Sequence, residues 1–337
     1  MNRPILLFGA AGCAASLLTI FAAPRAALAG WLAAFAFWSA LPIGSIGLLM
    51  MMWVIPGAWR QELAPLAERT STLLALAAVA VLPILLGAGA LYDWVHQPAH
   101  GYRAIYLSWP AFALRTIAFF LCLGALTLRL LGRPGRAGAL SAGGLILYLL
   151  LATTIAVDWL MSLDPEFHSS GFGLYIVCIQ MVSALAFMIA CRLMGRDAES
   201  RNGLLGALLL CGLLFWAYLA FMQYFIIWSN NLSPTVHWYQ QRAEGGWSLA
   251  EYAIGASGLG PAFLLLFTPI RNGARWLVGL SLVVLAGRAL EVAWIVLPTL
   301  HEHWAIAWIS TLLAFAGLGA LSLALPRAWP LARGAAS

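Results

Sequence analysis

Long apolar runs divide the chain, and the short links between them carry most of its charges. We place ten such runs at 5–23, 31–55, 70–91, 107–131, 138–162, 171–194, 203–228, 248–270, 275–297 and 303–326. About twenty apolar residues cross the hydrocarbon core of a bilayer as a helix, and a backbone in lipid must satisfy its own polar groups. The sequence therefore predicts an all-α polytopic membrane protein, a single integral domain over 1–337 with ten transmembrane helices.

Charge is scarce: 9% of the 337 residues are charged and 63% are hydrophobic, whereas a soluble domain carries about 25% charged residues. The first run has a second interpretation, because Arg3, an apolar stretch and the Ala-Ala-Leu-Ala sequence at 26–29 also resemble a cleavable signal peptide. We expect a retained first span.

Arginine, which supplies all 18 basic residues, predicts the orientation. An even number of spans places both termini on one side. That side then holds thirteen arginines, at Arg3, Arg60, Arg69, Arg129, Arg133, Arg136, Arg192, Arg196, Arg201, Arg271, Arg275, Arg327 and Arg333. The other side holds three, at Arg25, Arg103 and Arg242. The positive-inside rule puts both termini in the cytoplasm, and we expect the bacterial inner membrane.

The histidines and cysteines argue against a bound cofactor. The histidines all fall in or beside outer links, at His96, His100, His168, His237, His301 and His303, whereas haem b in a helical bundle needs histidines within the spans. The five cysteines lie in apolar runs without a C-x-x-C pair. We expect no haem, cluster or metal on this chain.

The arginines form no basic stretch with interleaved aromatics, so nucleic acid is not an expected partner, while lipid is.

Proton-exchanging groups gather at one place, the stretch Asp158–Gly173. Asp158 ends the fifth span, while Asp164, Glu166 and His168 follow in an outer-face loop. We expect Asp158 to be the candidate for proton chemistry. For the three loop residues, a turn or a contact with a partner is an equal alternative.

Polar groups within spans are costly and are functional candidates. They are Asp158, Glu251, Glu291, Arg115, Arg288, Gln180 and Gln223. Arg288 and Glu291 are three residues apart, so they share a helix face. One hypothesis is a proton route opening to the periplasm, since desolvation favours the neutral carboxyl and a nearby arginine the charged one. The alternative is structural, with Arg288 and Glu291 neutralising each other and the other acids ending helices. The inner half offers only hydroxyls, such as Ser39, Ser45, Tyr148, Thr153 and Thr154.

Proline and glycine predict interruptions in three spans, at 42–44, 83–89 and 255–261. Broken helices mark binding sites in secondary transporters, which keeps that class as an alternative. A polar loop at 228–247 and an outer belt of tryptophans indicate interfacial anchoring, or a surface for a partner protein or a quinone ring.

Four segments resemble one family. They are DWLMSLDPEFHSSGFGLYIV from Asp158, YLSWPAFALRTIAFF from Tyr106, FWAYLAFMQYFIIWSNNL from Phe215 and EVAWIVLP from Glu291. Together they are similar to the second NrfD-like (polysulfide-reductase-type, ActF-type) membrane subunit of alternative complex III, a quinol:cytochrome c oxidoreductase. Arg115 and Glu291 stand in the family's arginine and acidic positions. Ser233–Val236 departs from its Pro-Glu-Glu.

The resemblance implies a fold and an assembly. The fold would be two four-helix bundles, spans two to five (31–162) and six to nine (171–297), flanked by spans one and ten. The partners would be a homologous NrfD-like quinol-binding subunit, an iron–sulfur protein, c-type cytochromes and often a haem–copper oxidase. The c-type haems and iron–sulfur clusters would lie in those partners, and quinol would be a ligand of the complex. This chain would be a cofactor-free respiratory subunit, not catalytic alone, carrying a proton path or a quinone-adjacent pocket. The alternative within the complex is a scaffold that docks other subunits.

Overall fold

A computed structural model describes residues 3–96, 101–132, 137–195, 200–230, 233–300 and 302–325. Within these ranges the chain forms helices and no strand. The predicted all-α polytopic character is confirmed at this level. Arg133, Arg136, Arg196, Arg327, Arg333, His100 and His301, which entered the predictions above, lie outside the described residues.

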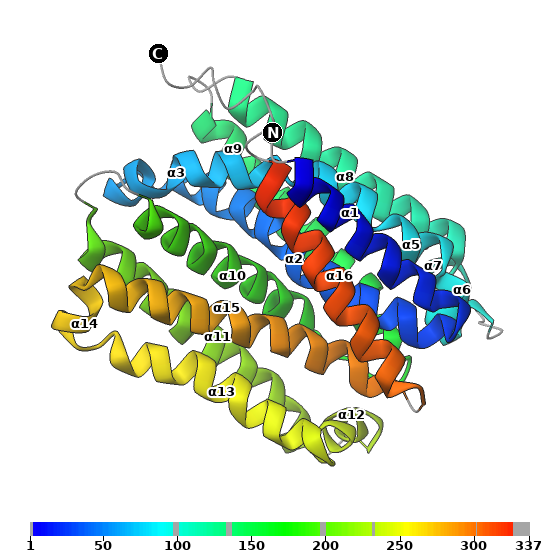
Figure 1. The fold of residues 1–337 in the computed structure, drawn as a ribbon. Helices are drawn as coiled ribbons and strands as arrows, with labels where there is room; N and C mark the ends of the chain where they lie inside the picture. Colours follow the sequence, from blue (N-terminus) through cyan, green and yellow to red (C-terminus); the bar gives the residue numbers. More distant parts are fainter. Residues whose placement is uncertain are drawn as a thin grey trace.

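The helices follow the predicted apolar runs closely (Figure 1). The N-terminal half contains α1 (Arg3–Leu18), η1 (Thr19–Phe21), α2 (Pro24–Val54), α3 (Ala58–Ser71), α4 (Leu74–Ala80), α5 (Leu82–Leu86), α6 (Ala88–Leu91), η2 (Asp93–Val95), α7 (Tyr102–Tyr106), α8 (Trp109–Gly132), α9 (Ala137–Trp159) and η4 (Met161–Leu163). The C-terminal half contains α10 (Phe172–Met194), α11 (Asn202–Asn230), α12 (Ser233–Ala243), α13 (Gly246–Leu264), α14 (Thr268–Asn272), α15 (Ala274–Val296), η5 (Leu297–Thr299) and α16 (Trp304–Ala324).

Nine helical stretches of the described chain are long and apolar enough to cross a membrane. They correspond to nine of the ten predicted spans. The eighth predicted span is α13, whose 19 residues reach about 28 Å at 1.5 Å per residue. It is less apolar because it carries Glu251 and several glycines and serines. The eighth span, and with it the count of ten, therefore stays a prediction.

Helix α2 is the centre of the structure. Most of its side chains are buried, and it packs against α3, α9, α10, α15 and α16. Small residues allow these close approaches, as expected where lipid supplies no hydrophobic drive between helices. A Cβ on Gly44 would lie 2.2 Å from the Gln180 carbonyl oxygen, and one on Gly30 would lie 2.4 Å from that of Ala307. The backbones of α10 and α16 are thus held directly against α2.

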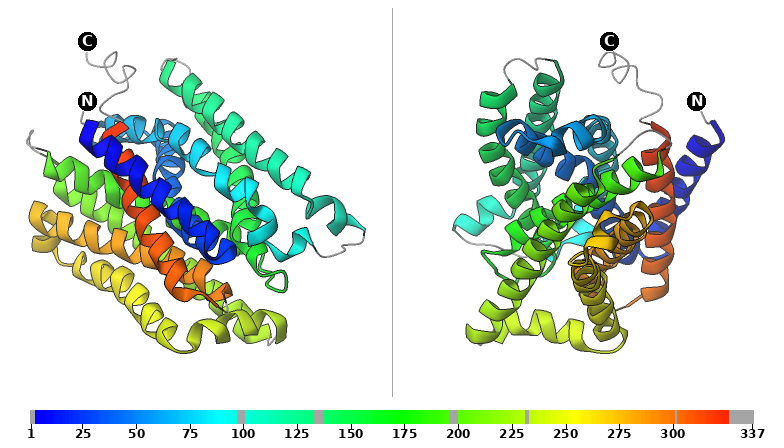
Figure 2. Two further views of the ribbon diagram at one scale, coloured as in Figure 1. Left: turned by 45° about the vertical axis from the view of Figure 1, so that its right-hand side comes forward. Right: turned by 90° about the vertical axis from the view of Figure 1, so that its left-hand side faces the viewer.

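Two groups of helices pack on either side of this centre. Helices α3, α4, α8 and α9 lie on one side, with α8 against both α4 and α9. On the other, α10 packs on α11 and α15, and α13 packs on α11 and α15. Helices α1 and α16 lie side by side along α2 (Figure 2). Ser16 and Ser310 hydrogen-bond across this α1–α16 contact at 2.8 Å between their hydroxyl oxygens.

The predicted interruptions occur in one span of three. The third span is divided at Val81 and Gly87 into α4, α5 and α6. The prediction was wrong for the second span, because α2 continues through Pro42 from Pro24 to Val54. In α13 the helix continues through 255–260 and ends at Leu264, just past Pro261. Membrane helices tolerate proline where their surroundings satisfy the freed backbone carbonyl.

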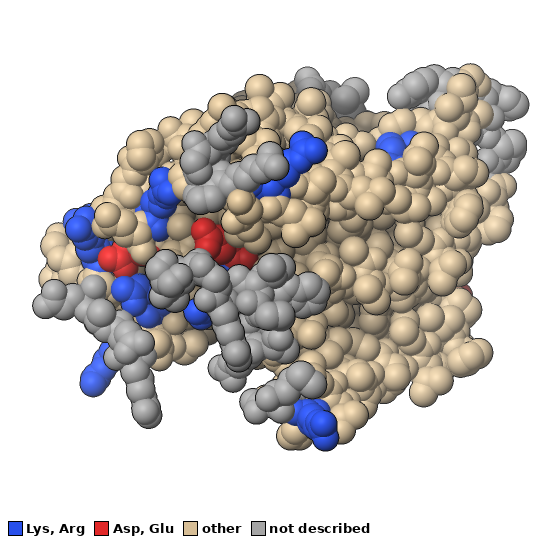
Figure 3. Space-filling model, turned by 90° about the horizontal axis from the view of Figure 1, so that it is seen from above, with Lys and Arg blue, Asp and Glu red and all other residues tan. Residues whose placement is uncertain are grey.

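The described ends of α1 and α16 lie at the same end of the molecule (Figure 1). Helix ends and one link at this end carry Arg60, Arg192, Arg201, Arg271 and Arg275. Figure 3 shows basic side chains gathered on this face with few acidic ones among them. We call it the arginine-rich end; the opposite end, called the outer end below, holds the link 160–171 and the segment 233–245. Which end faces the cytoplasm stays a prediction.

The contact between α2 and α10 generates a stability prediction. Gly44→Ala places a methyl group against the backbone of α10, so we expect a loss of about 1–3 kcal/mol, typical of overpacking. Gly124→Ala is the matched control, because its Cβ would meet nothing within 4 Å, and alanine is the better helix former. Titration with SDS, followed by tryptophan fluorescence, measures both. Equal stability of the two variants would contradict the close packing at Gly44.

Candidate functional site

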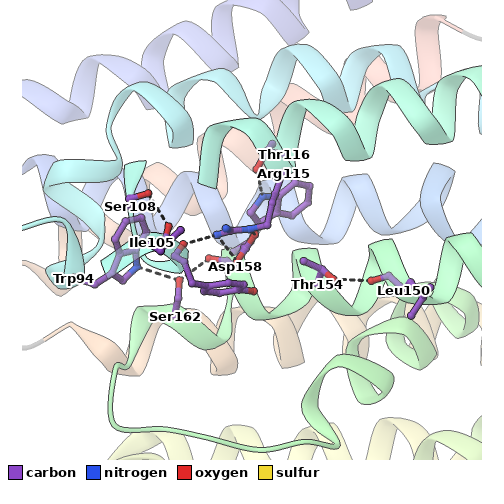
Figure 4. A network of polar contacts seen from close by, with 11 residues as sticks. Trp94, Ile105, Ser108, Arg115, Thr116, Leu150, Thr154, Asp158 and Ser162 are labelled. Atoms are coloured by element: carbon purple, nitrogen blue, oxygen red, sulfur yellow. Dashed lines mark hydrogen bonds and ion pairs between the residues drawn. The ribbon is translucent and has the colours of Figure 1, made fainter. Parts of the chain in front are cut away.

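The first candidate site is an ion pair between α8 and α9 (Figure 4). Arg115 Nε donates to Asp158 Oδ2 at 2.6 Å, and its Nη2 donates to Asp158 Oδ1 at 3.0 Å. Nη2 also donates to the Tyr106 carbonyl at 3.0 Å, and the guanidinium lies 4.0 Å from the centre of the Tyr106 ring. Asp158 is 1% exposed and Arg115 is 21% exposed. The contact is a bidentate arginine–carboxylate salt bridge, a geometry for which the planar guanidinium is well suited.

A frame of hydrogen bonds fixes the end of α9 around this pair. The Ser162 hydroxyl donates to the Asp158 carbonyl at 2.5 Å, and the Tyr92 hydroxyl donates to the Trp159 carbonyl at 3.0 Å. Both carbonyls belong to the last turn, where no helical partner exists. Trp94 donates in turn to Ser162. Residues far apart in sequence thus position the Asp158 carboxylate.

The second candidate site is an ion pair within α15. Arg288 Nη1 lies 2.5 Å from Glu291 Oε2, and the two side chains are 0% and 1% exposed. Glu291 Oε1 accepts hydrogen bonds from the Tyr175 hydroxyl and, at 2.9 Å, from Trp216 Nε1. The Arg288 guanidinium lies 3.7 Å from the centre of the Trp216 ring. The buried acid is therefore held by a cation, a phenol and an indole.

The second pair is less completely satisfied than the first. Among the residues that the structure describes, Arg288 Nε and Nη2 have no hydrogen-bond partner, and the contact of Nη1 with Glu291 has the distance but not the alignment of a hydrogen bond. A buried pair that lacks good hydrogen bonds recovers little of its desolvation cost. Such a cost is typical of functional rather than structural charges in membrane helices.

A cavity of about 430 Å³ lies beside Glu291, between α10, α11, α12, α13 and α15. Its walls are mainly aromatic, and include Trp216, Phe221, Tyr224, Trp238, Tyr239 and Trp294. Glu291 is buried in it, whereas Glu251 is an exposed side chain on its lining. The predicted candidates Glu251 and Glu291 are thus brought to one cavity, whose volume is in the range of small-molecule sites.

Glycines shape this cavity. A Cβ on Gly258 would lie 2.2 Å from the Trp216 ring, and one on Gly287 would lie 1.7 Å from the Ser257 hydroxyl. The first glycine makes room for the indole that binds Glu291. The second lets α13 pack closely on α15.

Gln180 lies apart from both pairs, on α10 in the contact with α2. It lines a small cavity of about 20 Å³ together with Ser39, Trp159 and Val292, which is room for about one water molecule. Its Oε1 atom has no hydrogen-bond partner among the described residues. The small cavity that Gln180 lines thus also touches Trp159 and Val292, which directly follow Asp158 and Glu291 in the sequence.

The loop after Asp158 forms a compact turn. Asp164 Oδ1 accepts the Glu166 N–H at 3.1 Å, and His168 Nδ1 lies 2.8 Å from the Glu166 carbonyl oxygen. Glu166 and His168 are exposed, and buried Phe167 stacks on Trp238 with ring centres 4.4 Å apart. Neither described pair includes Asp164, Glu166 or His168. The turn geometry matches the structural alternative for these residues.

Arg242 has an unexpected place. The sequence analysis counted it as a loop arginine, but the 228–247 segment contains the helix α12, and Arg242 on it is fully buried. It donates to the carbonyls of Trp238, Trp294 and Ile295, at 2.8, 3.1 and 2.6 Å respectively. Two of these carbonyls end α15, where a cation is favourable. Burial lowers the pKa of the Arg242 guanidinium to about 9, so it stays charged at neutral pH.

The sequence analysis missed other partners as well. Tyr175 and Trp216 lay in apolar runs with no signal to single them out. At the arginine-rich end, nearly buried Glu62 accepts a bond from Arg192 at 3.1 Å. The prediction that placed Thr153 and Thr154 in the inner half was wrong, because Thr153 lies against Gly173 in the first turn of α10, at the outer end. Their hydroxyls donate to carbonyls of their own helix. By contrast, the buried hydroxyls of Ser45 and Tyr148 have no partner within the described ranges.

No family model matches this chain, and no curated protein matches it. In the part of the chain that the structure describes, no three His, Cys, Asp or Glu side chains gather as metal ligands. The two ion pairs and the aromatic cavity are therefore the features from which a function can be inferred.

The burial of Asp158 generates a prediction. Arg115→Leu leaves a buried carboxylate without its cation, which costs about 3–5 kcal/mol. The double variant Arg115→Leu with Asp158→Leu regains most of that loss, because no charge is left unpaired. Arg25→Leu is the control: Arg25 pairs with Asp93 at 2.8 Å, but both side chains are about 40% exposed, and such pairs contribute about 1 kcal/mol or less. SDS titration of the purified chain ranks the three variants; a double variant no better than Arg115→Leu would contradict the pairing.

Proposed function

We propose that this chain is a cofactor-free integral subunit of a quinol-oxidising respiratory complex of the alternative-complex-III type. Within it, the chain provides a proton route that opens at the outer end. One observation carries the proposal: each helix group contains a buried carboxylate paired with arginine near that end. Asp158 lies in the last turn of α9, and Glu291 contacts Tyr175 in the first turn of α10. The link 160–171 joins these two helices, so both acids lie at one end of the molecule.

The chemistry of these acids fits proton transfer. A carboxyl in a dry interior exchanges protons when two influences nearly cancel, burial favouring the neutral form and a cation the charged form. Asp158 and Glu291 are both buried and are both paired with an arginine. Tyr175 adds a hydroxyl that can donate to Glu291 or accept from it.

Each acid also has access toward solvent or lipid. Arg115 is partly exposed beside Asp158. Glu291 borders the 430 Å³ cavity, whose lining includes exposed Glu251. The second group therefore offers a route from a buried acid through a cavity to a second acid at the surface.

The resemblance supports the same assignment. The segments beginning at Tyr106 and Asp158 supply Arg115 and its carboxylate partner. Those beginning at Phe215 and Glu291 supply Trp216 and the acid that it binds. The family's partners would then hold the c-type haems and iron–sulfur clusters.

A scaffold role is the competing proposal, and the outer end favours it through one observation. Arg242 fastens helix α12 to α15, and the stacked rings of Phe167 and Trp238 hold the turn after Asp158 against α12. A rigid outer surface of this kind suits the docking of another subunit. The two roles are separated by a substitution that removes an acid without disturbing that surface.

Asp158→Asn is that substitution. We expect the complex purified through this chain to keep its subunits and its visible spectrum. In proteoliposomes, the number of protons released per quinol, or the quinol-dependent turnover, should fall several-fold because a transferable proton is lost. Asp93→Asn, in the half-exposed pair with Arg25, is the control and should retain both values. An unchanged proton yield and turnover in Asp158→Asn would refute the proton route and favour the scaffold.

A further inference from the structure

Glu251 is an acid without a counter-ion on the wall of the aromatic cavity. It lies in the second turn of α13, and its side chain is exposed. Within the described ranges it takes part in none of the ion pairs. An ionisable group on a membrane helix is costly unless a partner of opposite charge compensates it. Glu251 is therefore placed to pair with a cation that the described part of the chain does not supply.

The charge of the cavity lining depends on Glu251. Glu291 also borders the cavity, but its side chain is 1% exposed and is paired with Arg288. The residues of the described chain that line the cavity include no arginine or histidine, and the sequence contains no lysine. Because Arg288 neutralises Glu291, one uncompensated negative charge remains on the lining, at Glu251.

Aromatic rings stand beside this acid. Tyr224 of α11 and Tyr239 of α12 both line the cavity and meet edge to face, with ring centres 5.4 Å apart and planes at 84°. Glu251 lies close enough to Tyr239 to act on it electrostatically. The faces of aromatic rings attract organic cations. The rings and the acid therefore favour the same kind of occupant, a positively charged one.

The opening of the cavity indicates the rest of the occupant. Helix α12 packs against both α11 and α13 and crosses between their outer ends (Figure 2). The exposed lining residues are Phe221 and Tyr224 on α11, and Glu251 and Leu259 on α13. The cavity thus opens sideways, between two membrane helices. Leu259 lies eight residues beyond Glu251, about 12 Å along the helix, so an apolar body can extend from the acid toward the middle of the membrane.

We propose that this cavity binds a lipophilic organic cation that enters from the bilayer between α11 and α13. Its charge pairs with Glu251 beside the rings of Tyr224 and Tyr239, and its apolar body fills the space of about 430 Å³. The proposal goes beyond the proton route, which needs no ligand. It depends on the acid, the rings and the opening of the cavity.

Other membrane molecules fit less well. A zwitterionic phospholipid would bring a phosphate beside its ammonium group, and that phosphate would find Glu251 but no basic side chain on the lining. A neutral apolar molecule would fill the space but would leave Glu251 without a counter-ion. A single positive charge on an apolar body satisfies the acid, the rings and the opening together.

Binding of tritiated tetraphenylphosphonium to the full chain, purified in dodecyl maltoside, tests the proposal. Glu251→Gln keeps the size of the side chain but removes its charge, so affinity should fall at least tenfold. Glu244→Gln is the matched control, because Glu244 is an exposed acid between α12 and α13 that does not line the cavity. It should bind as the wild type does. Equal affinity of the two variants would overturn the pairing with Glu251.

Filling the cavity tests the location. Gly255 lines it, and a Cβ there would meet nothing within 4 Å, so Gly255→Leu fills space without a clash of its Cβ. Gly260→Leu is the control on the same helix, with the same open surroundings but no place on the cavity lining. We expect at least tenfold weaker binding of tetraphenylphosphonium in Gly255→Leu and unchanged binding in Gly260→Leu. Unchanged affinity in Gly255→Leu would place the probe elsewhere and refute the site.

A pair of competing ligands separates charge from apolar contact. Methyltriphenylphosphonium and triphenylphosphine oxide carry the same three rings, but only the first is a cation. The oxide should need at least a tenfold higher concentration to displace the probe. Equal displacement by the oxide would show a site for any apolar molecule. Displacement by dihexanoylphosphatidylethanolamine as effective as that by the phosphonium would make a phospholipid the occupant. Either result would overturn the proposal.

The cation site and the proton route can fail independently. Asp158→Asn should leave tetraphenylphosphonium binding intact, because Asp158 lies in the other helix group and borders a different set of residues. The binding measurement uses the isolated chain and needs no quinol turnover. Loss of the proton route would therefore leave the cation site standing, and absence of binding would leave the proton route standing.

Discussion

The cost of a charge in lipid governs this molecule. A membrane interior offers no water to a buried ion, so each must find its partners within the helices. Arg115 does so with Asp158 and a backbone carbonyl, and Arg242 does so with three carbonyls and an indole ring. These contacts join α8 to α9 and α12 to α15. The few buried charges thus fix the relative position of these helix ends at the outer end. Apolar packing is not directional and would fix that position less tightly.

Close backbone packing makes these meetings possible. Gly44 brings α10 against α2, and Gly258 leaves the space that the Trp216 ring fills beside Glu291. The contact at Gly44 holds α10 against the central helix α2. The space at Gly258 lets the Trp216 indole lie where it donates to Glu291. Glycine therefore acts here through the absence of a side chain. In lipid, where close contact rather than hydrophobic exclusion holds helices together, such positions decide which polar groups come within bonding distance.

Periodicity and charge were enough to predict much of the fold. Apolar runs predicted the helices because twenty residues without charge have few alternatives in a membrane protein, and intramembrane acids were recognisable as candidates by type alone. Contacts across helices were not predictable. Tyr175 resembles any aromatic residue in an apolar run until α10 and α15 are packed together, and Arg242 resembles a loop arginine until α12 is folded. The prediction at Pro42 was wrong because membrane helices tolerate proline, and α2 continues through it.

The two ion pairs differ in a way that bears on function. The Asp158 carboxylate is matched on both oxygens by one guanidinium, and its helix end is tied by Ser162 and Tyr92. Glu291 shares one oxygen between two neutral donors, while part of the Arg288 guanidinium has no hydrogen-bond partner among the described residues. An ion pair with all its hydrogen bonds made is costly to separate, because moving either partner leaves a buried charge without its counter-ion. An incompletely matched pair beside a cavity can gain from a new hydrogen bond. A response to a new hydrogen-bond partner is therefore better placed at Glu291 than at Asp158, whose carboxylate is already matched on both oxygens.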